Sequence, residues 1–140
     1  MPKFTPEEKL FRFVAVRPRS EKEIRDWFRR RKIPEDLHLS LFDRLKSLDL
    51  LDDRKFAAWW VEQRIQFRSK SKKEIEYELR NKGIDKEIIT EALAGSGIDE
   101  LKSAKKLLER YASRTRQQKI DYLARKGFAW EVIDRLVSKE

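Results

Sequence analysis

Short amphipathic runs, each led by the same helix-start signal, recur three times along the chain. The signal is Ser/Thr-x-x-Glu/Gln, and it occurs as SEKE (20–23), SKKE (71–74) and TRQQ (115–118). In such a capping box the hydroxyl and the acid or amide satisfy two backbone N–H groups at the start of a helix. The runs that follow read IRDWFRRRKI, IEYELRNKGI and KIDYLARKGF, and they predict three short helices at equivalent places.

The residue just before the last apolar position of each run indicates how the helix ends. It is Gly83 in the second run, Gly127 in the third and Lys32 in the first. Glycine adopts the left-handed conformation that ends many helices. Lys32 therefore either accepts a steric cost in that conformation or ends its helix in another way.

Two further helices are predicted around each run. A longer helix precedes each box, over 6–16, 53–68 and 98–113. A third element with apolar residues at helical spacing follows each run, and these residues are Leu37, Leu41, Leu45 and Leu48, then Ile88, Ile89 and Leu93, then Val132, Ile133, Leu136 and Val137.

The chain is therefore predicted to be all-α, with about nine helices in three three-helix units. We place the units at 1–51, 52–97 and 98–140, with the boxes at 20, 71 and 115 lying 51 and 44 residues apart. Units this small share cores with their neighbours and stack into an elongated, curved array. The segment AGSGID, 94–99, is the expected hinge between the second and third units.

The stretch FAAWWVEQRI, 56–65, carries two adjacent tryptophans that cannot both point into one core. One face of the predicted helix holds Phe56, Ala57, Trp60, Arg64 and Phe67. This places Trp60 in the core, whereas Trp59, at the edge of that face, either packs on the adjoining unit or anchors a partner. Arg64 must pair with a carboxylate or extend its charged end to solvent along its apolar stem. The candidate acids are Asp52, Asp53 and Glu78.

Composition fits a folded helical protein. Hydrophobic residues make up 39% of the 140 residues and can supply a core, while four Gly and four Pro are too few for a many-turned sheet. The absence of Cys excludes disulfides and thiolate metal sites and favours a reducing cytoplasm. No apolar run approaches the ~20 residues that span a bilayer, and we expect no membrane or targeting segment.

The net charge of +9 predicts an acidic partner, most simply nucleic acid. The excess is spread over the three units as +4, +1 and +4, from 13 basic and 9 acidic residues, then 10 and 9, then 11 and 7. Three clusters are candidate contacts. They are the run Arg29, Arg30, Arg31 and Lys32 at a helix end, the joint Arg68, Lys70, Lys72 and Lys73, and the joint Arg110, Arg114, Arg116 and Lys119. We favour the two joints because they correspond in the repeat.

An enzymatic function has little support in the sequence. His38 is the only histidine, and no Gly-rich phosphate loop, nucleophile elbow or metal-ligand spacing is present. The acid pairs at 7–8 and 52–53 occupy predicted helix starts, where the helix dipole favours negative charge. We therefore expect no catalytic residue, no cofactor and no metal.

The run LKSLDLLDDRKFAAWWVEQRI, 45–65, resembles the central signature of the RecX family of recombinase regulators. The matching residues are Asp52, Asp53, Phe56, Ala57, Trp60, Val61 and Arg64. RPRSEKEIRDWF, 17–28, and EIEYELRNKGI, 74–84, resemble the flanking family segments, the latter at Glu78, Leu79, Lys82, Gly83 and Ile84. One departure is Ser71 or a neighbouring Lys where many relatives have glycine, and the capping box offers a substitute helix start.

The resemblance implies a non-enzymatic monomer that lies along the groove of a RecA–DNA filament and blocks filament growth, ATP turnover and strand exchange. Spread positive charge and spare aromatics such as Trp59 would suit that partner. The alternative is a helical module that binds DNA directly, for which Gln117 and Gln118 lie at the only suitable helix start. A scaffold whose basic surface serves solubility alone is the third possibility.

Overall fold

The computed structural model describes residues 3–138, and within that range it contains nine α-helices, one short 3-10 helix and no strand. The helices are α1 (Pro6–Val16), α2 (Glu21–Arg30), the 3-10 helix Glu35–Leu37, α3 (His38–Ser47), α4 (Asp53–Arg68), α5 (Lys72–Asn81), α6 (Lys86–Gly95), α7 (Glu100–Glu109), α8 (Arg116–Arg125) and α9 (Trp130–Val137). The all-α prediction is confirmed. Helix α7 is shorter than the predicted 98–113, because the chain turns from Arg110 onward.

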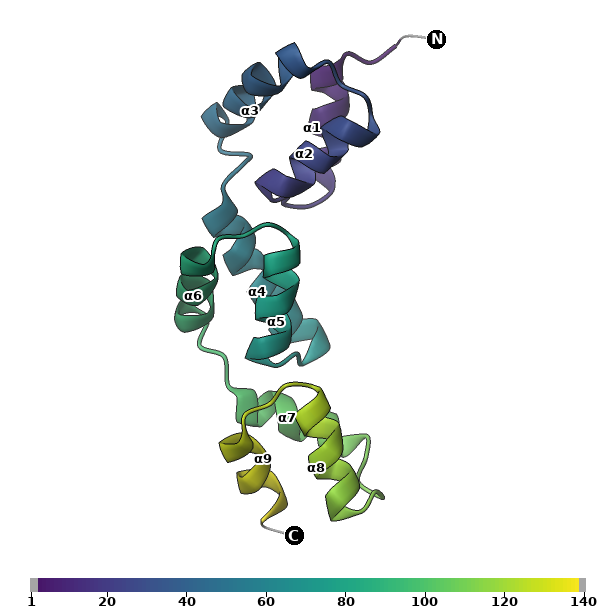
Figure 1. Ribbon diagram of the computed structural model, residues 1–140, viewed down its shortest axis with the longest axis vertical. Coiled ribbons are helices and arrows are strands. Elements are labelled where there is room, and N and C mark those ends of the chain that lie inside the picture. The colour runs from purple at the N-terminus through teal and green to yellow at the C-terminus, as the bar shows by residue number, and fades with distance from the viewer. Residues whose placement is uncertain (1–2, 139–140) are drawn as a thin grey trace.

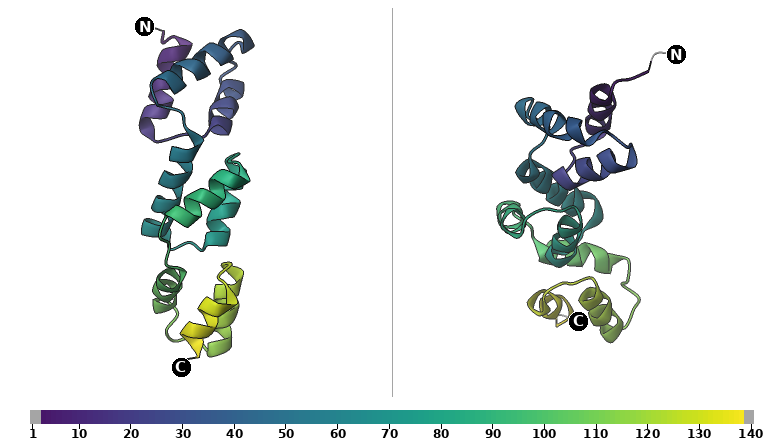
Figure 2. Two further views of the ribbon diagram at one scale, coloured as in Figure 1. Left: turned by 90° about the vertical axis from the view of Figure 1, so that its left-hand side faces the viewer. Right: turned by 45° about the horizontal axis from the view of Figure 1, so that its top comes forward.

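The nine helices form an elongated, curved array of three stacked sets (Figure 1). We call α1–α3 unit one, α4–α6 unit two and α7–α9 unit three. The second helices of the units, α2, α5 and α8, follow one long side, and the third helices, α3, α6 and α9, follow the other. Further views show the units following one another along the long axis, with the chain ends at opposite ends of the array (Figure 2).

Each unit has a separate apolar core, so the prediction that neighbouring units share their cores is wrong. The buried residues are Leu10, Ile24, Trp27, Phe28, Leu41, Leu45 and Leu51 in unit one, and Phe56, Ala57, Trp60, Val61, Ile75, Leu79, Ile84 and Ile89 in unit two. Unit three has the smallest set, Ala104, Leu123, Phe128, Ile133 and Val137. Of the apolar stripes predicted for the third helices, Leu48 is the residue that stays outside, since it is 44% exposed.

All three predicted capping boxes form. Ser20, Ser71 and Thr115 each accept a hydrogen bond from the backbone N–H three residues on, and the side-chain oxygen at that position accepts one from the backbone N–H of the cap residue. A fourth box joins Thr5 to Glu8 at the start of α1. This box was not among the three predicted, although residues 5–8 carry the same Thr-x-x-Glu pattern.

The helix-ending residues all adopt the left-handed conformation, with φ of 53° at Lys32, 78° at Gly83 and 88° at Gly127. The glycines have a second role because the preceding unit lies against them. A Cβ atom at Gly83 would lie 2.6 Å from Cβ of Lys22, and one at Gly127 would lie 3.1 Å from Oγ of Ser71. Lys32 is exposed, so its side chain is tolerated at the cost of backbone strain alone.

The capping serines also join the units. Oγ of Ser20 donates a hydrogen bond to the carbonyl oxygen of Lys82 at 2.7 Å, and Oγ of Ser71 donates to that of Lys126 at 2.6 Å. Both serines are fully buried. The start of α2 therefore rests on the end of α5, and the start of α5 rests on the end of α8.

A pair of glycine substitutions tests this junction. Gly83→Ala should lower the free energy of unfolding by about 2–4 kcal/mol, because left-handed strain adds to overpacking against Lys22. Gly97 is the matched control, since it has φ of 67° and no atom within 4 Å of its Cβ position. Gly97→Ala should cost only the strain, about 1–2 kcal/mol. Urea unfolding measures both, and equal losses would contradict the close contact between units.

Candidate functional site

The family-like signature in α4 builds the core of unit two. Nε of Arg64 donates to Oε1 of Glu78 at 3.1 Å, and Nε1 of Trp60 donates to the same oxygen at 3.3 Å. The Arg64 guanidinium lies 4.3 Å from the Trp60 ring centroid. The pairing predicted for Arg64 is thus made with Glu78, and Trp60, only 9% exposed, is the core tryptophan.

The other two acids considered for Arg64 have different contacts. Asp52 caps α4 by accepting from the N–H groups of Arg54 and Lys55. Asp53 accepts from the backbone N–H of Glu21 at 2.9 Å and so links α4 to the start of α2. Burial raises the pKa of Asp53, and the hydrogen bond from Glu21 opposes that rise.

The two aromatic residues flanking this core differ from the helical-wheel picture. Phe67, on the same predicted face as Trp60, is 66% exposed, so its predicted place on the buried face of α4 is wrong. Trp59 is half-buried against the unit-two core, and the guanidinium of Arg17 from unit one lies 5.9 Å from its ring centroid. These contacts favour packing at the junction for Trp59 over a free anchor.

Groove one is an open depression of about 640 Å³ along α2. Its walls are Phe13, Arg17, Arg19, Glu23, Asp26, Arg29, Arg30 and Lys82. The predicted contacts Arg29 and Arg30 therefore share a surface with three basic residues that were not predicted as contacts, Arg17, Arg19 and Lys82. Five cations and two carboxylates make this groove strongly positive.

The carboxylates of groove one are already held by neighbours. Glu23 pairs with Arg17 at 2.5 Å and with Lys82 at 3.4 Å, and Asp26 pairs with Arg29 at 3.1 Å. Burial by itself would raise the pKa of Glu23, but the hydrogen bonds and charges around it, led by Arg17, lower it overall.

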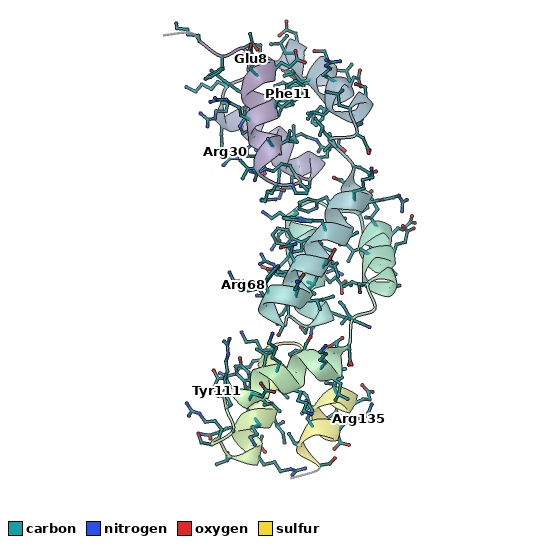
Figure 3. The ribbon with its side chains drawn as sticks, turned by 180° about the vertical axis from the view of Figure 1, so that it is seen from behind. Glu8, Phe11, Arg30, Arg68, Tyr111 and Arg135 are labelled. Atoms are coloured by element: carbon teal, nitrogen blue, oxygen red, sulfur yellow. The ribbon has the colours of Figure 1, made fainter. Side chains whose placement is uncertain are left out.

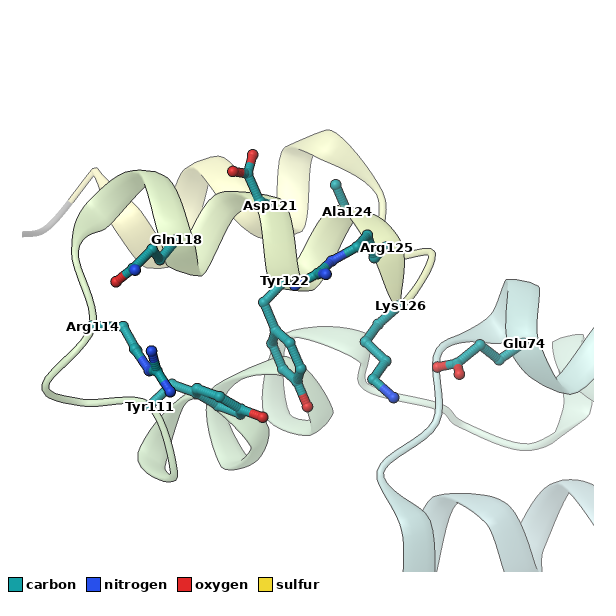
Figure 4. Close-up of a pocket in the computed structure, with 9 residues that line it drawn as sticks. All are labelled: Glu74, Tyr111, Arg114, Gln118, Asp121, Tyr122, Ala124, Arg125 and Lys126. Atoms are coloured by element: carbon teal, nitrogen blue, oxygen red, sulfur yellow. The ribbon is translucent and has the colours of Figure 1, made fainter.

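Groove three is the larger depression, about 970 Å³, beside α8 (Figure 4). Its walls are Glu74, Tyr111, Arg114, Gln118, Asp121, Tyr122, Ala124, Arg125 and Lys126. The ring centroids of Tyr111 and Tyr122 lie 4.3 Å apart, with Arg114 beside the first ring and Lys126 beside the second. Of the predicted contacts in the third unit, this groove includes Arg114.

The remaining predicted contacts lie in different surroundings. Exposed side chains are found at Arg31, Arg68, Lys72, Lys73, Arg110 and Arg116. Lys70 is half-buried and pairs with Glu74 at 3.7 Å. The aliphatic part of Lys73 lies over Gly127 at the junction with unit three. Lys119 is 9% exposed and lies among the buried residues, which separates it from the surface candidates.

Seen from behind, Arg30, Arg68 and Tyr111 point to the same long edge of the array, whereas Arg135 lies on the opposite edge (Figure 3). We call the side that carries Arg30, Arg68 and Tyr111 the basic edge. Four further residues of this edge, Arg17, Arg19, Arg125 and Lys126, were not predicted as contacts. A signal was available, because Arg19, Lys70 and Arg114 each directly precede a capping residue.

Catalytic or membrane features are not apparent in the described part of the chain. The His38 ring stacks on Phe28 at 4.4 Å, and its Nε2 lies 2.9 Å from the carbonyl oxygen of Ile33. Residues 3–138 contain no group of three or more His, Cys, Asp or Glu side chains placed to hold a metal ion. None of the helices described there is long and apolar enough to cross a bilayer.

Three stacked helical units with a basic edge define an α-helical repeat protein. Residues 52–93 match the family model for the second three-helix domain of RecX. A regulatory protein RecX of Mycobacterium avium is 30% identical over 92% of this chain and 80% of its own, and one of Thermobifida fusca is 30% identical over 92% and 75%. The chain belongs to the RecX family.

Other relatives differ in length. The regulatory protein RecX of Oceanobacillus iheyensis is 33% identical over 91% of this chain, which spans only half of that protein. The crystal structure of RecX from Lactobacillus salivarius superposes with a TM-score of 0.79 and 26% identity, covering 95% of this chain and 92% of that one. The helical-repeat architecture is thus common to the family.

Substitution of the core tryptophan tests its assigned face. Trp60→Ala should lower the free energy of unfolding by roughly 3–5 kcal/mol, since it leaves a cavity and removes a hydrogen bond to Glu78. Trp130 is 60% exposed, so Trp130→Ala should cost less than about 1 kcal/mol. Chemical denaturation compares the two variants, and a Trp60 loss as small as that of Trp130 would show the face to be misassigned.

Acid titration tests the Glu23 contacts. A carboxylate with a lowered folded-state pKa stabilises the fold above its unfolded pKa, near 4.3, and loses that contribution as the pH falls through the folded value. Glu23→Gln should therefore be less stable than the native protein at neutral pH, with the gap closing at acid pH. Exposed Glu131, changed to Gln, is the control. A gap that stays constant with pH would refute the assignment.

Proposed function

We propose that this protein is a non-enzymatic regulator that binds RecA–DNA filaments and inhibits filament extension, ATP turnover and strand exchange. The observation that carries the proposal is the match to a RecX crystal structure over nearly the whole of both chains, with a TM-score of 0.79. The partner and the inhibition follow from the RecX resemblance of the signature in α4. In this proposal the protein works as a cytoplasmic monomer without a cofactor.

The shape and charge of the array support an extended acidic partner. The three units stack into one elongated body, and basic side chains line one long edge from Arg30 past Arg68 to groove three. Phosphates of a nucleoprotein filament would meet cations along this edge. Exposed Phe67 and Tyr77 add aromatic surface on the central unit, of the type that contributes most to protein interfaces.

The rival function, direct binding of DNA by the helical module without a recombinase, has weaker support where it requires reading of base edges. Its candidate base-reading residues were Gln117 and Gln118 at the start of α8. The Gln118 side chain accepts the Thr115 N–H in the capping box, and the Gln117 amide donates to Asp121 at 2.9 Å. Both amides are therefore engaged inside the helix, which disfavours direct readout of base edges.

ATP hydrolysis by a RecA recombinase on saturating single-stranded DNA is the direct test. The protein should inhibit at well below one molecule per recombinase subunit, and inhibition should persist when the salt concentration is raised a few-fold. Binding that is mainly to bare phosphates would weaken ~10-fold or more over the same change. Inhibition only at DNA-coating amounts, abolished by salt, would favour the DNA-binding module instead.

Charge reversal on the central unit tests the basic edge. Arg68→Glu should leave the fold intact, because its side chain is exposed, and should raise the protein concentration needed for half-inhibition about threefold or more. Lys72 and Lys73 are left unchanged, because the first interacts with the Glu100 carboxylate and the second packs on Gly127. Lys105, also exposed and changed to Glu, controls for the total charge. Equal effects in the two variants would exclude a role specific to this part of the edge.

A further inference from the structure

Groove one and groove three are built alike at equivalent positions of the repeat. When the capping residues Ser20, Ser71 and Thr115 are matched, the residue before the cap is Arg19, Lys70 or Arg114. The residue ten after the cap, at the other end of the same helix, is Arg30, Asn81 or Arg125. Units one and three thus have arginine at both positions, and all four arginines line the two grooves.

In groove one the two arginines keep donors available. Nε of Arg19 donates to the carbonyl oxygen of Phe13 at 3.2 Å, and the guanidinium lies 3.9 Å from the Phe13 ring centroid. Neither Arg19 nor Arg30 has a carboxylate within 4 Å in the described part of the chain. The two acids of the groove, Glu23 and Asp26, are held by other cations.

The charges in groove one also lie close enough to affect one another. Burial lowers the pKa of Arg19, and the charges of Arg17 and Arg30 lower it further, against the opposing effect of Glu23. The guanidinium remains protonated at neutral pH because arginine titrates far above it. An anion placed between Arg19 and Arg30 would relieve this repulsion.

Groove three repeats the arrangement with a tyrosine wall. The Arg114 guanidinium lies 5.8 Å from the Tyr111 ring centroid. In groove one the equivalent arginine, Arg19, lies over the Phe13 ring. Among residues 3–138, no carboxylate pairs with Arg114 or Arg125, and Asp121 accepts from Gln117. In the close-up, Arg114, Tyr111 and Tyr122 surround one open space (Figure 4).

We propose that grooves one and three are paired binding sites for the sugar-phosphate backbone of one nucleic-acid strand, with Arg19 and Arg30 in the first and Arg114 and Arg125 in the second. Guanidinium groups bind phosphate oxygens by two parallel hydrogen bonds, and the Phe13 and Tyr111 rings support the first arginine of each pair. The sites recur two units apart on one body, so the ligand is a polymer rather than a single small anion. The choice of nucleic acid rests on the proposed function.

Oligonucleotide binding by site-specific variants tests the proposal. Fluorescence anisotropy of a labelled oligothymidylate, long enough to follow the array from unit one to unit three, measures affinity over a range of salt concentrations. Arg19→Gln with Arg30→Gln should weaken binding about tenfold or more, and so should Arg114→Gln with Arg125→Gln. Each pair should also reduce the slope of log affinity against log salt by about one or more.

A matched variant separates the grooves from total charge. Lys46 in α3 and Lys86 in α6 are exposed and belong to helices on the opposite long side. Lys46→Gln with Lys86→Gln removes the same charge and should change affinity by less than about threefold. Should the groove variants weaken binding no more than this control, the proposal is overturned. Equal competition by inorganic pyrophosphate at matched phosphate concentration would also overturn it, because the ligand would then be a small anion.

Two further measurements keep the outcome clear. Arg19→Lys with Arg30→Lys retains the charge and should recover most of the affinity at low salt, and urea unfolding checks that every variant is folded. Recombinase ATPase assays on the same proteins distinguish the two ideas. Groove-dependent oligonucleotide binding without any inhibition by the native protein would reject the proposed function alone. Inhibition by the native protein, with oligonucleotide binding insensitive to the grooves, would reject the paired sites alone.

Discussion

The hydroxyl of a helix-capping serine is the interaction on which the array depends. Ser20 and Ser71 each accept a backbone N–H at the start of their own helix and donate to the last carbonyl of the second helix in the next unit. One side chain therefore specifies both where a helix begins and how two units meet. Because both serines are buried, their loss would leave polar backbone groups unsatisfied on two helices at once.

Local sequence patterns were enough to predict most of the helices. The capping boxes and apolar periodicity locate the second and third helices, since each depends on residues within a few positions of one another. The end of α7 was overestimated because the apolar pattern continues to Tyr111 although the backbone already turns at Arg110. The helical wheel placed Phe67 on the buried face of α4, but its ring is 66% exposed, although Ile65 in the same turn packs on the unit-two core.

The candidate surface was harder to predict because it depends on contacts between distant segments. The sequence left three acids open as partners of Arg64, and the structure pairs it with Glu78. Arg17 and Lys82 meet at Glu23 from different units, which no local pattern indicates. Charge runs alone ranked Lys119 with the surface residues, whereas packing in unit three buries it. Repeat alignment was the better guide, because equivalent residues in stacked units fall on one side of the body.

Lys32 gives the array a direction. It occupies the position equivalent to Gly83 and Gly127, the glycines against which the preceding unit packs. Pro6, at the first position of α1, is likewise equivalent to Asp53, which accepts a hydrogen bond from unit one. The outer face of unit one therefore lacks both features that receive a neighbour. In unit three, Thr115 and Arg116 are exposed. The equivalent residues of unit one, Ser20 and Glu21, donate hydrogen bonds to unit two. The start of α8 thus differs from the starts of α2 and α5, each of which is covered by the end of the second helix of the next unit.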